Sequence, residues 1–158
     1  MSESLPDIAA LRAQAMSLLA RREHSRRELR DKLVRKYGLE ASLSAQVEGV
    51  LDKLEADGLQ SDLRFAENTL HARARRGFGP LRIAHELSGH DLDREVINTL
   101  LDDSGLDWSE LARKAILKKY SSAELGDDAR QLARARRFLS YRGFGGDHIR
   151  FALDDCPD

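Results

Sequence analysis

Histidine and cysteine are the residue types in this sequence that could hold a metal or act as a nucleophile. Five histidines lie between residues 24 and 148, with no H-E-x-x-H pattern and no pair at i, i+4 spacing that could share a metal. The single cysteine, Cys156, is the third residue from the end, which excludes an internal disulfide and a Cys-based zinc finger. We therefore predict no metal, no cofactor and no catalytic thiol.

Two copies of the tetrapeptide Arg-Gly-Phe-Gly, at 76–79 and 142–145, look superficially like phosphate-binding loops. No predicted strand precedes either copy and no Gly-Lys-Ser/Thr follows, so we interpret both as turns in which Phe78 and Phe144 plug equivalent helix junctions. There is also no G-x-S-x-G motif, and the scattered carboxylates fall at predicted helix caps. The sequence therefore predicts a protein that is not an enzyme.

The charge is distributed unevenly, although 26 basic and 27 acidic residues give a net charge of −1. Three segments are basic (21–36, 73–82 and 130–142), whereas 91–110 holds seven carboxylates and one arginine. Such segregation favours a polarised surface that approaches a polyanion or an acidic protein face by one side, and an ordinary solvated face is the alternative. The candidate binding residues are Arg21, Arg22, Arg26, Arg27, Arg73, Arg75, Arg76, Arg130, Arg134 and Arg137.

Two details support these candidates. Arg26 and Arg27 fall in the first turn of a predicted helix, where the helix dipole disfavours cations, so something else is expected to hold them there. The helix that ends near Arg142 separates its apolar and basic residues onto opposite faces. Its apolar face is Leu132, Ala135 and Leu139, and its opposite face is Arg130, Arg134, Arg137 and Tyr141.

The elements that position these residues are predicted to be helices only, because Leu and Ala number 44 while Val, Ile and Thr number 11. Ser25 with Glu28, Asp91, and Asp107 are the expected caps of the second, sixth and seventh helices. No segment is long and apolar enough to span a membrane, and no secretory signal is visible. We expect helices at about 7–22, 25–38, 44–57, 61–77, 80–88 and 91–105, one opening at Asp107, a loop at 121–127, one ending near Arg142, and one carrying Ile149 and Leu153.

The helices form an internal repeat. Residues 51–59 match 98–106 at a shift of 47, and each match ends one helix at a glycine and opens the next. A second match joins 25–33, 79–87 and 145–153, and it leaves the register of the third copy open. We predict an all-α protein of three tandem three-helix repeats, 1–58, 59–106 and 107–158, in an elongated curved stack.

The segments Ser25–Leu33, Asp57–Asp62 with Arg64-Phe65-Ala66, and Phe138–Gly145 make the chain resemble the bacterial RecX regulatory protein family over nearly its whole length. The resemblance implies a cytoplasmic, non-enzymatic modulator of the RecA recombinase that acts in DNA repair, homologous recombination and the SOS response. It implies a protein that lies along the groove of the RecA–DNA filament and suppresses filament growth, ATP hydrolysis, strand exchange and coprotease activity. The implied partners are RecA and its filament on DNA, with single- or double-stranded DNA as a further candidate and no membrane, and the protein is expected to be a monomer.

Two other functions stay open from the residues alone. An autonomous nucleic-acid-binding helical protein would use one repeat much like a helix-turn-helix, but a pI of about 6.5 is low for a domain held mainly by phosphates. An adaptor protein without any DNA contact is the third possibility. Salt-dependent binding to naked DNA would separate the autonomous nucleic-acid-binding protein from both the RecA regulator and the adaptor.

Overall fold

The protein is described by a computed structural model over residues 6–38, 41–120 and 128–154. These residues form helices and no strand, which confirms the all-α prediction, and none of the helices is long and apolar enough to cross a membrane. The predicted loop at 121–127, Cys156 and the first five residues lie outside the described residues. The helices are α1 (Ile8–Arg21), α2 (Arg26–Tyr37), α3 (Ala41–Ala56), α4 (Asp62–Arg75), α5 (Pro80–Ser88), α6 (Arg94–Asp102), α7 (Trp108–Lys119), α8 (Ala129–Arg142) and α9 (Gly146–Asp154).

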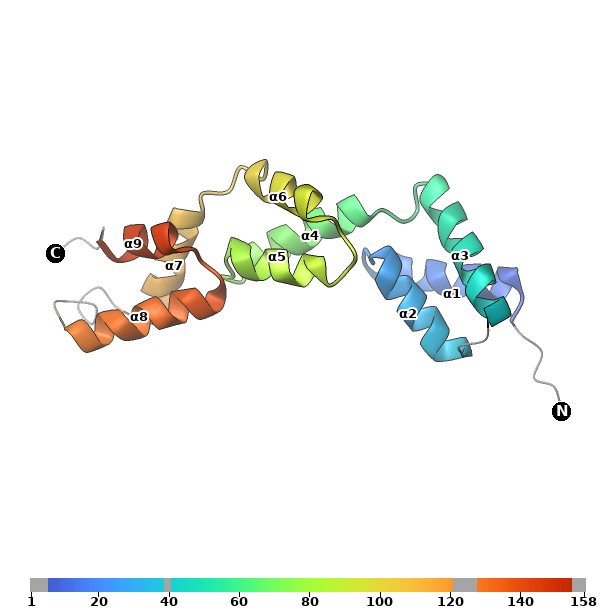
Figure 1. Ribbon diagram of the computed structural model, residues 1–158, viewed down its shortest axis with the longest axis horizontal. Coiled ribbons are helices and arrows are strands. Elements are labelled where there is room, and N and C mark those ends of the chain that lie inside the picture. The colour runs from blue at the N-terminus through green and yellow to red at the C-terminus, as the bar shows by residue number, and fades with distance from the viewer. Residues whose placement is uncertain (1–5, 39–40, 121–127, 155–158) are drawn as a thin grey trace. The chain divides into compact units, whose positions relative to one another are not determined.

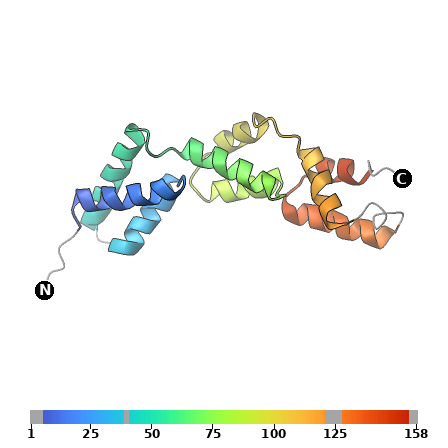
Figure 2. The ribbon, with the colours of Figure 1, turned by 180° about the vertical axis from the view of Figure 1, so that it is seen from behind.

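The chain divides into two compact units, Met1–Asn68 and Thr69–Asp158. In the first unit, α1, α2 and α3 pack around one core (Figures 1 and 2). The helical period of the sequence predicts an apolar stripe of Val47, Val50, Leu51 and Leu54 on α3, and all four residues are buried. The same period predicts Ile8, Leu11, Ala15 and Leu18 on one face of α1. Leu11 and Ala15 are buried and Leu18 packs against the core, but Ile8, the first residue of the helix, is 59% exposed.

Two of the three predicted caps are present. Ser25 Oγ accepts the Glu28 N–H at 3.1 Å, and Asp107 Oδ1 accepts the Glu110 N–H at 3.1 Å. The prediction for Asp91 is wrong: α6 begins three residues later, after Asp93. Asp91 instead adopts a φ of 62°, a conformation that aspartate tolerates better than most residues, and so takes part in the turn that follows α5.

In the second unit, the second half of α4 together with α5 and α6 buries Leu70, Ala74, Ile83, Leu87 and Ile97. The buried positions of α4 therefore follow an i, i+4 row through its second half. The helical period of the sequence predicts Phe65, Thr69 and Ala72 on the buried face of α4. Phe65 is buried, but Thr69 and Ala72 are only partly buried, because the buried row of this helix is Ala66, Leu70 and Ala74.

The last three helices, α7, α8 and α9, share one core (Figures 1 and 2). Ala112 and Ile116 come from α7, Ala135 and Leu139 from α8, and Ala152 and Leu153 from α9. The third repeat therefore begins at α7, which resolves the register that the sequence left open. The residue limits of the three repeats stay a prediction.

The two Arg-Gly-Phe-Gly segments lie against each other through their backbones. The Gly79 N–H donates to the Arg142 carbonyl at 2.7 Å, and the Leu81 N–H donates to the Gly143 carbonyl at 2.9 Å. A Cβ on Gly79 would lie 2.5 Å from the Gly143 carbonyl, so this approach requires glycine. One segment follows the first helix of its repeat and the other follows the second, so the two junctions are not equivalent, contrary to our interpretation. We call this contact the glycine junction.

The two phenylalanines differ in burial. Phe144 is 2% exposed and completes the core of α7, α8 and α9, as expected of a plug. Phe78 is only half-buried, and the Arg82 guanidinium lies 4.3 Å from its ring centroid. The two rings therefore have different surroundings although their tetrapeptides are identical.

Candidate polyanion-binding surfaces

The α8 arginine face, which we define as Arg130, Arg134 and Arg137, is exposed. Among the described residues, no carboxylate forms an ion pair with any of these three guanidinium groups. Asp128 caps α8 by accepting the Arg130 backbone N–H at 3.0 Å, so the local acid serves the helix end. The face can therefore neutralise phosphates or carboxylates of a partner.

An aromatic side chain extends the α8 arginine face toward the glycine junction. Tyr141 is 76% exposed, and the Arg82 guanidinium of α5 lies 5.3 Å from its ring centroid. Arg82 also approaches the Tyr141 carbonyl at 3.5 Å. Arg82 of the second basic segment therefore contacts Tyr141 of the third, and both side chains are exposed.

The candidates of the second basic segment differ in their freedom to bind. Arg73 makes two hydrogen bonds of 2.8 Å with Glu86, and these bonds raise the pKa of Arg73 and lower the pKa of Glu86. Arg75 and Arg76 are exposed, and both line a hollow that also receives Arg142. Arg73 therefore has a structural partner, whereas Arg75 and Arg76 are available to a ligand.

The candidates of the first basic segment lie in the other compact unit. Arg21 is exposed at the end of α1. Arg22 is held by Glu28, with its Nη2 2.5 Å from a carboxylate oxygen; burial opposes ionisation of Glu28, but the hydrogen bond from Arg22 lowers the pKa of this carboxyl. Arg27 is exposed and lies 3.9 Å from Asp31 on the next turn. In this group, intramolecular carboxylates already neutralise much of the charge.

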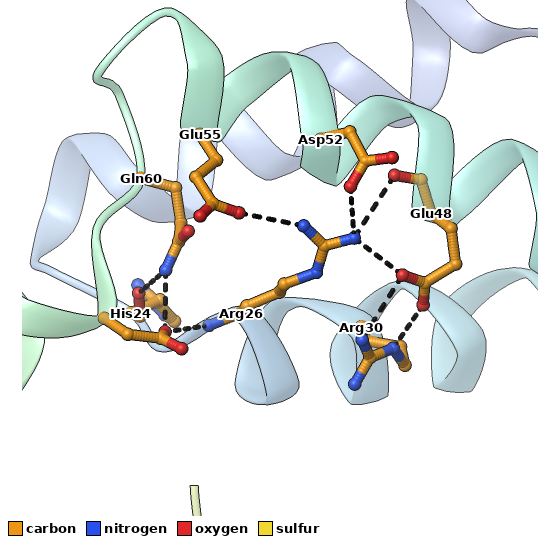
Figure 3. Close-up of polar contacts among 8 residues, drawn as sticks. His24, Arg26, Arg30, Glu48, Asp52, Glu55 and Gln60 are labelled. Carbon is orange, nitrogen blue, oxygen red and sulfur yellow. Dashed lines mark hydrogen bonds and ion pairs between the residues drawn. The ribbon is translucent and has the colours of Figure 1, made fainter. Parts of the chain in front are cut away.

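Arg26 is the most engaged of the candidates (Figure 3). Its guanidinium lies 2.7 Å from Glu48, 2.6 Å from Asp52 and 2.9 Å from Glu55, all on α3. Burial acts to lower the pKa of Arg26, but the three carboxylates outweigh burial and raise it. The acidic face of α3 therefore explains why an arginine occupies the first turn of α2, and no external ligand is needed.

The α3 carboxylates were missed from the sequence, although their spacing carried a signal. Glu48, Asp52 and Glu55 follow one another at i, i+4 and i+7, which places them on one face of a helix. Glu48 also accepts a hydrogen bond of 2.5 Å from Arg30, and Arg30 and Arg26 together lower the pKa of Glu48 to about 2. An acidic face on α3 that follows the basic helix α2 in the sequence therefore indicates ion pairs between the two helices.

The segment Asp57–Asp62, one of those that carried the family resemblance, has a structural role in the first unit. Gln60 is 2% exposed, and its Nε2 donates to the His24 carbonyl at 3.3 Å and to Asp62 Oδ1 at 2.9 Å. The same Asp62 oxygen accepts the Arg26 N–H at 2.8 Å. Asp62, at the start of α4, therefore caps the N-terminus of α2. Figure 3 shows the contacts of Gln60, His24 and Arg26 at this place.

His24 is buried between a backbone carbonyl and the ammonium group of Lys32. Its Nδ1 lies 3.0 Å from the Arg22 carbonyl, and its Nε2 lies 3.0 Å from Lys32 Nζ. Since an ammonium group only donates, Nε2 is the acceptor, Nδ1 carries the proton, and the ring is neutral. Burial is the largest cause that lowers the pKa of His24.

The described residues contain no group of three or more His, Cys, Asp or Glu side chains that could hold a metal ion. The residues that sequence reasoning missed near the candidates are Arg82, Arg142 and the lysines of α7. Lys114 and Lys118 stand at i, i+4 on α7, on the side away from its buried positions, and this spacing was a readable signal.

Three family models match the chain in tandem. The first, second and third three-helix domains of RecX match residues 12–54, 61–101 and 107–153. The regulatory protein RecX of Ectopseudomonas mendocina (strain ymp) is 45% identical over 149 residues, which cover 94% of this chain and 96% of that protein. The regulatory protein RecX of Stenotrophomonas maltophilia (strain R551-3) is 40% identical over 146 residues, which cover 92% and 86%.

A solved structure agrees with the fold. The crystal structure of RecX from Lactobacillus salivarius superimposes with a TM-score of 0.75 at 20% sequence identity, covering 94% of this chain and 96% of that one. Three tandem three-helix domains, matched by family models over most of the chain, confirm the resemblance drawn from the sequence motifs. This chain belongs to the RecX family of regulatory proteins.

Proposed function

We propose that this chain is a cytoplasmic, non-enzymatic regulator that binds the RecA recombinase in its filament on DNA. Binding inhibits the recombinase, ATPase and coprotease activities of RecA. The proposal extends the regulatory role named for its relatives, and RecA is the partner that the RecX resemblance implies.

The observation that carries the proposal is the α8 arginine face. Three exposed guanidinium groups on one side of a helix, with no carboxylate partner among the described residues, favour docking on a polyanionic assembly. The first basic segment is a weaker candidate because Arg22 and Arg26 are engaged by Glu28 and by the α3 carboxylates. We therefore assign the main filament contact to the second compact unit.

The experiment adds the purified protein to preassembled RecA filaments on single-stranded DNA. ATP hydrolysis and co-sedimentation are followed in the same samples. In the variant Arg130→Glu/Arg134→Glu/Arg137→Glu, we expect inhibition to weaken at least tenfold, which corresponds to about 1.4 kcal/mol. The fold should survive because Ala135 and Leu139, the buried residues of α8, are unchanged.

The matched control carries the same change in net charge at exposed positions outside the candidate surfaces. Lys53→Glu/Arg94→Glu/Arg150→Glu should inhibit RecA like the wild type. If the α8 contacts are to phosphates, wild-type binding should also weaken with salt at a log–log slope of roughly one per contact. A folded α8 variant that inhibits RecA as well as the wild type would remove this face from the site.

Naked DNA distinguishes the alternative function. An autonomous nucleic-acid-binding protein would bind single- or double-stranded DNA without RecA and lose that binding as salt rises. A regulator that recognises the filament would bind the filament far more tightly than either DNA alone. Tight binding to naked DNA that accounts for all filament binding would refute the proposal.

A further inference from the structure

A hollow of about 760 Å³ opens in the second compact unit, between the end of α4, α7 and the C-terminal half of α8. Six of its lining residues are cations and none is a carboxylate. Alkyl side chains, among them Leu111, Ala115 and Leu117, form the rest of the wall together with the Phe138 ring. We call it the cationic hollow; its cations are Arg75, Arg76, Lys114, Lys118, Lys119 and Arg142.

Two cations of the hollow, Arg142 and Lys119, are positioned by groups that do not neutralise their charge. Arg142 Nη1 donates to the Arg76 carbonyl at 3.1 Å, and its guanidinium lies 5.0 Å from the Phe138 ring centroid. Lys119 Nζ lies 4.3 Å from the same centroid. Carbonyls and rings orient a cation without neutralising it, so six like charges converge on one space. A ligand with several negative charges would relieve this repulsion.

The volume and the wall select among anionic ligands. A single phosphate would leave most of the space empty, since 760 Å³ lies in the range of sites that enclose a drug-sized molecule or several side chains. A nucleotide base would need an aromatic face on which to stack, but Phe138 is the one ring in the wall and two cations already lie against it. The rest of the apolar wall is aliphatic, which suits an aliphatic side chain.

We propose that the cationic hollow binds a peptide segment of a protein partner in which carboxylates flank a leucine-like apolar side chain. The apolar side chain contacts Leu111 and Ala115, and the carboxylates pair with the lysines of α7 and the arginines of the rim. This inference goes beyond the proposed function, because it rests on the charge and wall of the hollow and does not require that the partner be RecA.

The test measures fluorescence anisotropy of a labelled synthetic peptide, Glu-Asp-Glu-Leu-Leu-Asp-Glu-Asp, with the full chain. We expect saturable binding that weakens at least tenfold in Lys114→Gln/Lys118→Gln. This variant removes two charges from exposed positions of α7 and adds none, so the fold should be retained, which circular dichroism checks. Arg94→Gln/Arg150→Gln is the matched control, because it removes the same two positive charges from exposed positions that do not line the hollow, and it should bind the peptide within threefold of the wild type.

Two further probes and one measurement decide between occupants. The same peptide with both leucines replaced by serine should bind at least tenfold more weakly, and equal binding would overturn the apolar part of the proposal. A labelled oligo-dT that binds as well as the peptide and loses affinity in the same α7 variant would show a nucleic-acid site and overturn it. An oligomer of the wild type that becomes a monomer in the α7 variant would assign the hollow to the acidic segment 91–110 of a second copy, which also overturns it. RecA plays no part in these assays, so their failure leaves the proposed function standing.

Discussion

Alanine substitutions at Gly79, Gly105 and Gly143 separate two contributions to the free energy of unfolding. One is the steric overlap of an added Cβ with neighbouring backbone, and the other is the strain of a left-handed backbone. Gly79 has an ordinary extended backbone, with φ −93° and ψ 172°, but a Cβ there would lie 2.5 Å from the Gly143 carbonyl. Gly105 has the opposite character, with φ +73° and nothing within 4 Å of its added Cβ. Gly143 combines both, with φ +98° and an added Cβ 2.6 Å from the Arg82 nitrogen. The three variants therefore measure steric overlap, backbone strain and their combination.

The expected costs follow from this geometry. Gly105→Ala should cost about 1 kcal/mol, the penalty of left-handed backbone for a residue with a Cβ. Gly79→Ala should cost about 3 kcal/mol, because the overlap separates the segments and weakens two hydrogen bonds worth roughly 1 kcal/mol each. Gly143→Ala should cost about 4 kcal/mol, since strain adds to overlap. The double variant Gly79→Ala/Gly143→Ala should cost much less than the sum of the singles, because both disrupt one contact.

The assay is urea unfolding followed by circular dichroism, together with amide hydrogen exchange. The exchange of the Leu81 N–H reports the junction directly, since this group donates to the Gly143 carbonyl. We expect Leu81 protection to fall in Gly79→Ala and Gly143→Ala and to persist in Gly105→Ala. The reasoning fails if Gly79→Ala unfolds at the wild-type urea concentration with Leu81 still protected.

Three further predictions concern burial and charge. Phe144→Ala should destabilise the fold by about 3 kcal/mol or more and Phe78→Ala by less, because only the first ring is fully buried; wild-type melting with lost binding in both would make them contact residues instead. Since the folded pKa of His24 is lowered, stability should be fully present above its ordinary value of about 6.5 and fall as the pH drops through the folded pKa, whereas His24→Gln should show no such loss in that window in thermal melts. Glu48 should contribute stability above its ordinary pKa that is lost as the pH falls toward about 2, and in Arg26→Met an NMR titration should find its pKa closer to the ordinary value.

Local patterns predicted the helices well. Ser25 with Glu28 and Asp107 with Glu110 are present as caps, because capping depends on residues only three apart. The misplaced start of α6 has a local cause as well: Asp91 has the side chain of a cap but takes a left-handed backbone in the turn after α5. Residue type alone does not distinguish these two uses of aspartate.

The candidate site was predictable only in part, because charge segregation shows where cations are but not what neutralises them. Arg26 and Arg130 look equally basic in the sequence, yet α3 carboxylates engage the first and no described carboxylate engages the second. The cationic hollow was missed for a related reason, since it brings Arg76, Lys118 and Arg142 together from three separate elements. Such convergence depends on tertiary packing and has no fixed spacing along the chain.

The glycine junction also bears on the order in which the chain becomes stable during synthesis. The N-terminus of α5 has no cap of its own: Gly79 has no side chain, Pro80 has no N–H, and the Leu81 N–H finds its acceptor at Gly143. A helix of nine residues without a cap is marginal alone. While the ribosome is still adding α7 and α8, α5 therefore remains the fragile part of the nascent second unit. A nonsense mutation before residue 143 would consequently destabilise α5, although α5 precedes the mutation in the sequence, because the acceptor of the Leu81 N–H would be missing.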